Sequence, residues 1–144
     1  MIMDKELLLA DTQAFAADAG TTNVYDLGVG INLGDGEPMA LCISVDVAAD
    51  FTTTDETYAV DIQTDDNAAF ASPTSVVKVT ITAAKLVVGA LLTMPIPYGA
   101  TFERYLRAFV DVGGTTPSVT LTIFLQPVSM IDKRKDYADA ITIS

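Results

Sequence analysis

Carboxylates are the residues of this chain best suited to chemistry, and several of them occur close together. Glycoside hydrolysis uses two carboxyl groups about 5 to 9 Å apart across a cleft, and calcium is bound by oxygen ligands from loops. The sequence around Asp65 and Asp66 lacks the alternating ligands and the glycine of a calcium loop. Because Asp favours turns and a chain with 19 acidic residues contains such groups by chance, we interpret them as turn-forming or solvated side chains. The groups are Asp35 with Glu37, Asp55 with Glu56, and Asp61 with Asp65 and Asp66.

Other catalytic and metal-binding chemistry requires residues that the sequence lacks. The 144 residues include no histidine and a single cysteine, Cys42. Zinc and iron sites use clusters of His, Cys and carboxylate ligands, and nucleophilic triads use a His base. Cys42 lies between Leu41 and Ile43 in a predicted strand, so we interpret it as a buried structural thiol. The sequence therefore predicts a protein that is not an enzyme and has no metal or cofactor.

Basic residues are scarce, which makes them candidates for contact with a partner. The chain has 8 basic and 19 acidic residues, for a net charge of −11, and this excess argues against binding to nucleic acid. Arg104 and Arg107 lie on a predicted strand, where pairing with acids on neighbouring strands is the alternative interpretation. A single basic run occurs near the end of the chain, where a solvated stretch without function is the alternative. The run and the aromatic residue after it are Lys133, Arg134, Lys135 and Tyr137.

Alternating apolar and polar residues predict an all-β protein, because the side chains of a strand point alternately to two faces. The clearest strands are 103–112 and 118–126, and the glycine-rich turn 113–117 between them predicts a β-hairpin. A strand at 91–96 is expected at a sheet edge, because Pro95 and Pro97 cannot donate to a ladder. About eight strands with frequent turns indicate a β-sandwich. The other predicted strands are 21–27, 39–47, 57–64 and 76–82.

The length of 144 residues fits a single domain, which we divide into three parts. Residues 1–20 are predicted to be an extended N-terminal arm, 21–127 the β-sandwich, and 128–144 an extended C-terminal tail. The N-terminus lacks the pattern of a signal peptide. The longest weakly polar run, 86–100, is interrupted by glycine and prolines and is too short to cross a bilayer. We therefore expect synthesis in the cytoplasm and no membrane association.

Five stretches of the sequence carry a family resemblance. They are 4–14 (DKELLLADTQA), 22–28 (TNVYDLG), 34–38 (GDGEP), 63–70 (QTDDNAAF) with Ser72-Pro73 after it, and 103–107 (ERYLR). In this order they resemble the small jelly-roll capsid cement (decoration) proteins of tailed phages, of the type found on Bordetella phage heads. The resemblance implies a jelly roll, which is two antiparallel sheets in Greek-key order.

The resemblance also implies a structural role in the virion, on the outer surface of the capsid. The implied partners are the phage major capsid protein, whose neighbouring copies it would bridge, and the protein itself. A homodimer is favoured because isologous dimers are the commonest closed assembly, with a homotrimer as the alternative. A carbohydrate- or receptor-binding module on the virion is the rival function. We expect the terminal segments to carry assembly and the sandwich to carry stability.

Overall fold

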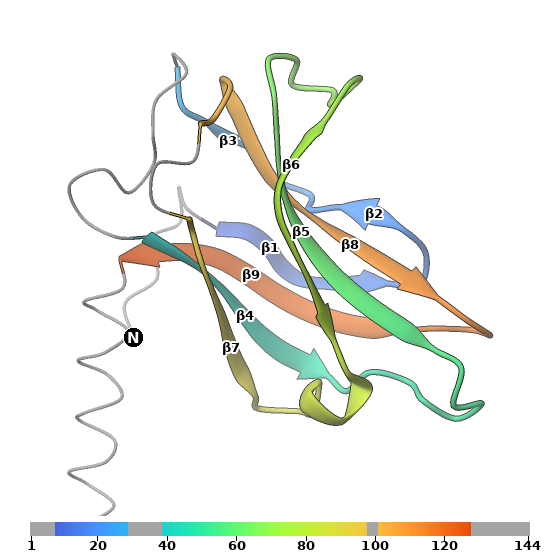
Figure 1. Ribbon diagram of the computed structural model, residues 1–144. Helices are drawn as coiled ribbons and strands as arrows, with labels where there is room; N and C mark the ends of the chain where they lie inside the picture. Colours follow the sequence, from blue (N-terminus) through green and yellow to red (C-terminus); the bar gives the residue numbers. More distant parts are fainter. Residues whose placement is uncertain (1–7, 29–38, 98–100, 128–144) are drawn as a thin grey trace, which may run out of the picture.

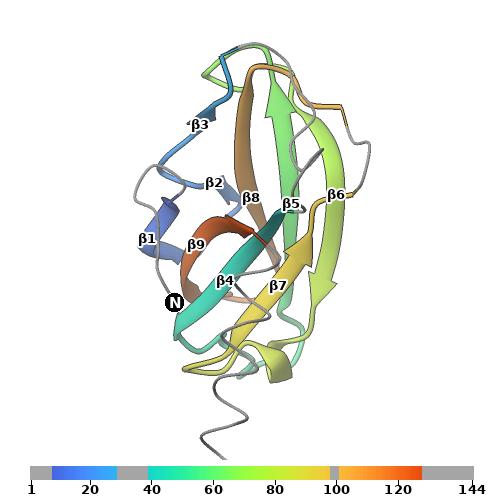
Figure 2. The same cartoon turned by 90° about the vertical axis from the view of Figure 1, so that its left-hand side faces the viewer.

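The computed structural model describes residues 8–28, 39–97 and 101–127, and these form two antiparallel β-sheets packed face to face (Figures 1 and 2). The first sheet has the order β1-β9-β4-β7, with β1 (Leu8–Phe15), β9 (Val119–Pro127), β4 (Met39–Val47) and β7 (Leu91–Pro95). The second has the order β2-β8-β5-β6, with β2 (Ala19–Gly20), β8 (Tyr105–Gly113), β5 (Thr57–Asp65) and β6 (Thr74–Ile81). The short strand β3 (Tyr25–Asp26) also pairs with β8.

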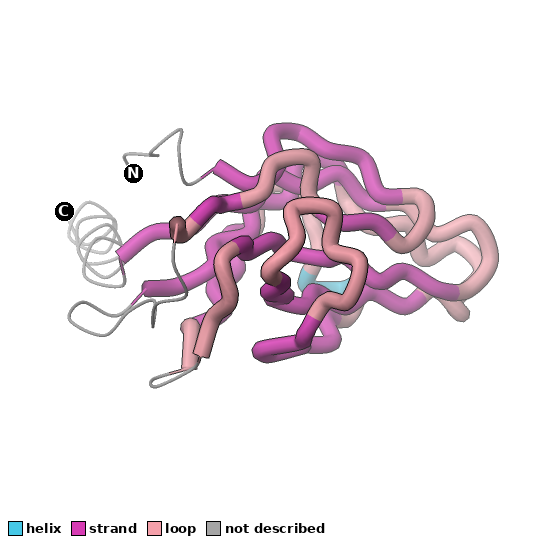
Figure 3. Tube along the Cα trace, turned by 90° about the horizontal axis from the view of Figure 1, so that it is seen from above, coloured by secondary structure: helices cyan, strands magenta, loops and turns pink. Residues whose placement is uncertain are grey.

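This strand order confirms the predicted jelly-roll-like sandwich. Successive strands cross from one sheet to the other between β4 and β5, between β6 and β7, and again on either side of β8. Double-sheet Greek-key connectivity of this kind defines a jelly roll. The connection between β6 and β7 holds the 3-10 turn η2 (Ala83–Lys85), which is the cyan segment in Figure 3. β7 ends its sheet, as its prolines predicted.

The hairpin predicted for 103–112 and 118–126 is wrong, although both strands exist. β8 pairs with β5, β2 and β3, whereas β9 pairs with β1 and β4 in the other sheet. The glycine-rich segment between them is therefore a crossover between sheets. The buried faces of the two strands meet across the core instead of lying side by side. Alternation identified those faces correctly but says nothing about pairing partners. The inward residues are Leu106, Ala108, Val110 and Val112 on β8 and Val119, Leu121, Ile123 and Leu125 on β9.

Residues 8–20 are not an arm, because they contribute β1 and β2 to the sandwich. Leu9, Ala10 and Phe15 of β1 are buried in the core. The pairing of β1 with β9 shifts register twice, between Leu8 and Ala10 and again before Gln13. These shifts break the period-two pattern that marks a strand, which explains why alternation missed β1. The rest of the predicted arm, 1–7, and the tail, 128–144, lie outside the described residues.

The core lies between the sheets and includes one tethered tyrosine. The Tyr58 side chain is buried, its hydroxyl donates to the carbonyl oxygen of Asp50, and it accepts the Ser118 N–H at 3.3 Å. This joins the loop before β5 to the start of β9.

Cys42 on β4 is fully buried, as predicted, and burial raises the pKa of its thiol to about 11.

Candidate functional site

The outer face of the β2-β8-β5-β6 sheet carries an ion pair and a set of hydrogen bonds between polar side chains. Side chains along β8 point alternately to the core and to this outer face. From Tyr105 to Val112 the inward residues are apolar, and the outward residues are aromatic or charged. Register places Gln63 of β5 opposite Arg107 of β8, and Asp61 opposite both Phe109 of β8 and Lys78 of β6. We call this surface the polar face, formed by Asp18, Asp61, Gln63, Ser75, Lys78, Arg107, Phe109 and Asp111.

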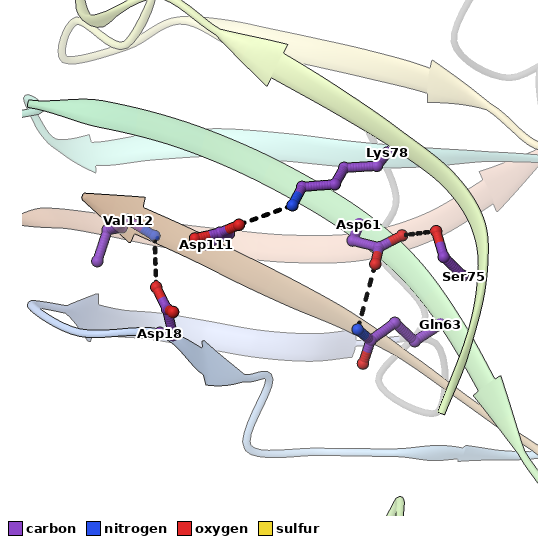
Figure 4. Close-up of polar contacts among 7 residues, drawn as sticks. All are labelled: Asp18, Asp61, Gln63, Ser75, Lys78, Asp111 and Val112. Carbon is purple, nitrogen blue, oxygen red and sulfur yellow. Dashed lines mark hydrogen bonds and ion pairs between the residues drawn. The ribbon is translucent and has the colours of Figure 1, made fainter. Parts of the chain in front are cut away.

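An ion pair connects the two strands that flank β5 on this face. Lys78 Nζ lies 2.7 Å from Asp111 Oδ2 (Figure 4). The bond lowers the pKa of Asp111, with a second contribution from a hydrogen bond with Asp18, and it raises the pKa of Lys78. Asp18 also accepts the Val112 N–H at 2.8 Å. The segment before β2 is thereby held against β8.

A hydrogen-bond chain runs across three strands of the polar face, and Figure 4 shows its part from Ser75 through Asp61 to Gln63. Ser75 Oγ donates to Asp61 Oδ1 at 2.5 Å, and Gln63 Nε2 donates to Asp61 Oδ2 at 3.2 Å. The Gln63 amide is thereby oriented with its oxygen toward β8, where it accepts from Arg107 Nε at 3.0 Å. Asp61 is only 6% exposed although it points outward. A buried carboxylate of this kind requires such partners.

Arg107 is held by rings as well as by Gln63. Its guanidinium carbon lies 4.2 Å from the centroid of the Phe70 ring and 5.2 Å from that of Phe109. Phe70 belongs to the β5–β6 loop and adopts a left-handed backbone with φ of +53°, which is unusual for an aromatic residue. On another side the Arg107 side chain lies against Gly20 of β2, where an added Cβ would come within 2.7 Å of Nη1. We call these residues the Arg107 cluster: Arg107, Gln63, Phe70, Phe109 and Gly20.

The charge of Arg107 is partly desolvated. Burial lowers the pKa of Arg107, while the nearby carboxylates of Asp65 and Asp61 oppose that shift. Asp65 is itself engaged with the β5–β6 loop, because it accepts the N–H groups of Asn67 at 3.1 Å and Ser72 at 2.8 Å. These bonds outweigh the effect of burial and lower the pKa of Asp65. The same carboxylate therefore shapes the loop that carries Phe70.

Arg104 has a different environment from Arg107. It precedes β8, and its side chain is exposed. Nε donates to Asp26 Oδ1 at 3.0 Å and Nη2 donates to Oδ2 at 3.2 Å, and this bond lowers the pKa of Asp26. Pairing with an acid, the alternative interpretation, is therefore confirmed for Arg104. The partner-contact role proposed for both arginines stays a prediction, and Lys133, Arg134, Lys135 and Tyr137 lie outside the described residues.

Two of the carboxylates picked out in the sequence, Asp55 and Asp65, accept hydrogen bonds from loop residues. Asp55 accepts from the N–H of Thr115 at 3.1 Å and from its hydroxyl at 2.8 Å, so it stabilises the β8–β9 connection. Together with Asp65, it confirms the interpretation of turn-forming acids. Asp35 and Glu37 lie outside the described residues. Within the described ranges, no group of three or more His, Cys, Asp or Glu residues is arranged to hold a metal ion.

The sequence predicted that Arg107 lies on a strand and is a candidate contact residue, but it did not predict which residues surround its side chain. Alternation along the predicted strand 57–64 puts Gln63 on the outer face, but its contact with Arg107 depends on the register between two strands, and the two residues are 44 positions apart in the sequence. Phe70 and Gly20 lie in segments without alternation. The local signal available was the Asp-Asp-Asn turn after β5, which marks a loop but not where its aromatic residue points.

The strand order and the polar face together define a small jelly-roll sandwich with a hydrogen-bonded, polar outer surface on one sheet. The model of the Bbp16 family matches residues 9–124, which run from β1 into β9. The chain therefore belongs to the Bbp16 family, a family of Bordetella phage proteins. A comparison with curated protein sequences gives no match. None of the helical segments in the described residues is long and apolar enough to cross a membrane.

Proposed function

We propose that this phage protein is a capsid cement (decoration) protein, which binds the outside of the head and bridges neighbouring major capsid proteins. The observation that carries the proposal is the polar face, where an ion pair and several hydrogen bonds hold long side chains in defined positions before any partner arrives. Side chains ordered in advance lose less entropy on binding, so such a face suits stable protein contact. Arg and aromatic residues are also enriched at protein interfaces.

The protein's own copies are the second partner in this proposal. A symmetric homodimer bridges two shell subunits with the same surface used twice, and a homotrimer would bridge three. Either assembly raises the effective concentration of the second contact and so strengthens binding to the shell. The virion's outer surface is the location that follows from this role.

The proposal is tested with phage heads assembled without this protein. Purified protein is added, and bound and free fractions are separated by sedimentation. We expect saturable co-sedimentation, labelling of intact heads by antibodies against the protein, and a higher melting temperature of the loaded shell, because a ligand that binds the assembled state stabilises it. Absence of co-sedimentation across a wide concentration range would exclude the cement role.

The rival function, a carbohydrate- or receptor-binding module, has one structural feature in its favour. A cavity of about 380 Å³ lies beside the start of β5 and the end of β6, and it is lined by Phe51, Tyr58, Ile81 and Ala83 among others. Phe51 is 48% exposed, as an aromatic platform for a sugar would be. Glycan-array binding that is lost in Phe51→Ala, with no binding to heads, would favour this function over cement.

A further inference from the structure

We propose that the terminal nitrogens of Arg107 bind the carboxylate of an Asp or Glu side chain of the major capsid protein. The inference rests on the proposed cement function and deepens it by naming the anchoring residue and the chemistry of its partner. Two observations carry it. The neighbours of Arg107 hold its side chain in one position, and its terminal nitrogens have no acceptor among the described residues.

The guanidinium of Arg107 is restrained on several sides but is not saturated with acceptors. Phe70 and Phe109 stack against it, Gly20 lies beneath the side chain, and Nε is occupied by Gln63. Within 8–28, 39–97 and 101–127, no oxygen accepts a hydrogen bond from Nη1 or Nη2 of this residue. Arg104, by contrast, uses both Nε and Nη2 on Asp26. Arg107 therefore presents oriented donors that the described part of the chain leaves open.

The partner group is a carboxylate because of the shape and charge of the site. Two guanidinium nitrogens match the two oxygens of a carboxylate in a planar, bidentate arrangement. The carboxylates of Asp61 and Asp65 act on the same guanidinium. They compensate part of its charge, so a single monoanion fits better than a dianionic phosphate. The net charge of −11 further disfavours nucleic acid as the partner.

The aromatic contacts and partial burial of Arg107 favour the binding of a carboxylate. Two aromatic rings lie close to the guanidinium and burial partly desolvates it. A charge that is already partly desolvated loses less solvation when it is paired. The conformation is also set before binding, which limits the entropic cost. An arginine in a well-packed, desolvated environment is a common binding hot spot at protein interfaces.

The first experiment detects the carboxylate directly. Arg107→Lys, added to heads at saturating concentration, is treated with a carbodiimide, which joins an amine to a carboxylate in direct contact. We expect mass spectrometry to identify an amide between position 107 and an Asp or Glu of the major capsid protein. Arg104→Lys is the matched control, since its amine has Asp26 as a neighbour within the chain. Cross-links from position 107 only to Asp61 or Asp65, or to a second copy of this protein, would overturn the inference.

The second experiment measures affinity for the same heads. Arg107→Gln is expected to bind at least about tenfold more weakly than the wild type. Lys85→Gln removes an exposed cation from the turn η2, away from the polar face, and should bind about as well as the wild type. Gly20→Ala places a methyl group against Nη1, so it should weaken binding while Arg107 is retained. Thermal unfolding of each variant shows whether the fold is intact.

The outcomes separate this inference from the proposed function. Wild-type protein that fails to bind heads would contradict the cement role itself. Wild-type binding with equal affinity for folded Arg107→Gln would leave the cement role standing and overturn the role of Arg107.

Discussion

Lys78 on β6 reaches across the whole of β5 to contact Asp111 on β8, with 2.7 Å between Nζ and Oδ2. The two strands are not neighbours, and the residue of β5 opposite Asp111 is the small Ala59. A larger side chain there would obstruct the span. The pair therefore depends on three strands being in register, and it fixes part of the polar face (Figure 4).

The first prediction concerns the acid dependence of this pair. The pKa of Asp111 is lowered in the folded protein from its ordinary value of 3.8, so its stabilising effect is present above that value and is lost as the pH falls through the lower, folded pKa. We expect Asp111→Asn to melt below the wild type at pH 7, and the difference to shrink as the pH falls below 3.8. Melting temperatures of both proteins across this range provide the measurement. A difference that is constant at all pH values would rule out the ion pair as its source.

The second prediction tests the inward face of β9. Leu121 and Ile123 are almost completely buried, so replacing either by Ala should lower the free energy of unfolding by about 2 to 5 kcal/mol. Val88, which is 68% exposed, provides the control, and Val88→Ala should change stability little. Denaturant unfolding measures all three. Unchanged midpoints for both core variants would contradict the assigned face.

The third prediction compares two glycines in left-handed conformations, Gly114 with φ of +93° and Gly89 with φ of +85°. Gly89 has nothing within 4 Å of an added Cβ, so Gly89→Ala should cost only the backbone strain, about 1 to 2 kcal/mol. At Gly114 the Cβ would lie 2.4 Å from the carbonyl oxygen of Asp55, a backbone atom. Gly114→Ala should therefore be clearly the more destabilising of the two in urea unfolding. Equal losses would mean that the crossover does not pack against the Asp55 loop.

The fourth prediction uses the thiol of Cys42. With its pKa raised to about 11 and its side chain fully buried, only about one molecule in a thousand would carry a thiolate at pH 8. A chromogenic disulfide reagent at that pH should leave the native protein unmodified and label one thiol per chain in denaturant. Rapid labelling of the native protein would show that β4 is accessible from outside.

The fifth prediction concerns residues 128–144, which follow β9. Deleting them should leave the melting temperature of the sandwich nearly unchanged and should reduce oligomerisation or binding to heads, because we expect the terminal segments to contribute to assembly alongside the polar face. Differential scanning calorimetry and the sedimentation assay measure the two effects separately. Unfolding on deletion would make the segment part of the core, and unchanged head binding would remove it from the contact.

Several features of this protein were determined by local sequence. The predicted strand 39–47 is β4 as observed, and the buried positions of β8 and β9 follow the alternation of apolar residues. Alternation is a property of a few consecutive residues, because each peptide unit turns the next side chain to the opposite face. The glycines and prolines similarly indicated where strands end, because their backbone restrictions act locally.

Pairing and the polar face were decided only by the tertiary structure. β8 and β9 are joined by a short turn yet belong to different sheets, and β1 is a strand despite its broken alternation. Arg107 meets Gln63, Phe70 and Gly20 from three other segments of the chain. Such neighbours depend on inter-strand register and on the packing of one loop over a sheet. These long-range contacts are selected by the burial of the whole core, which no local pattern encodes.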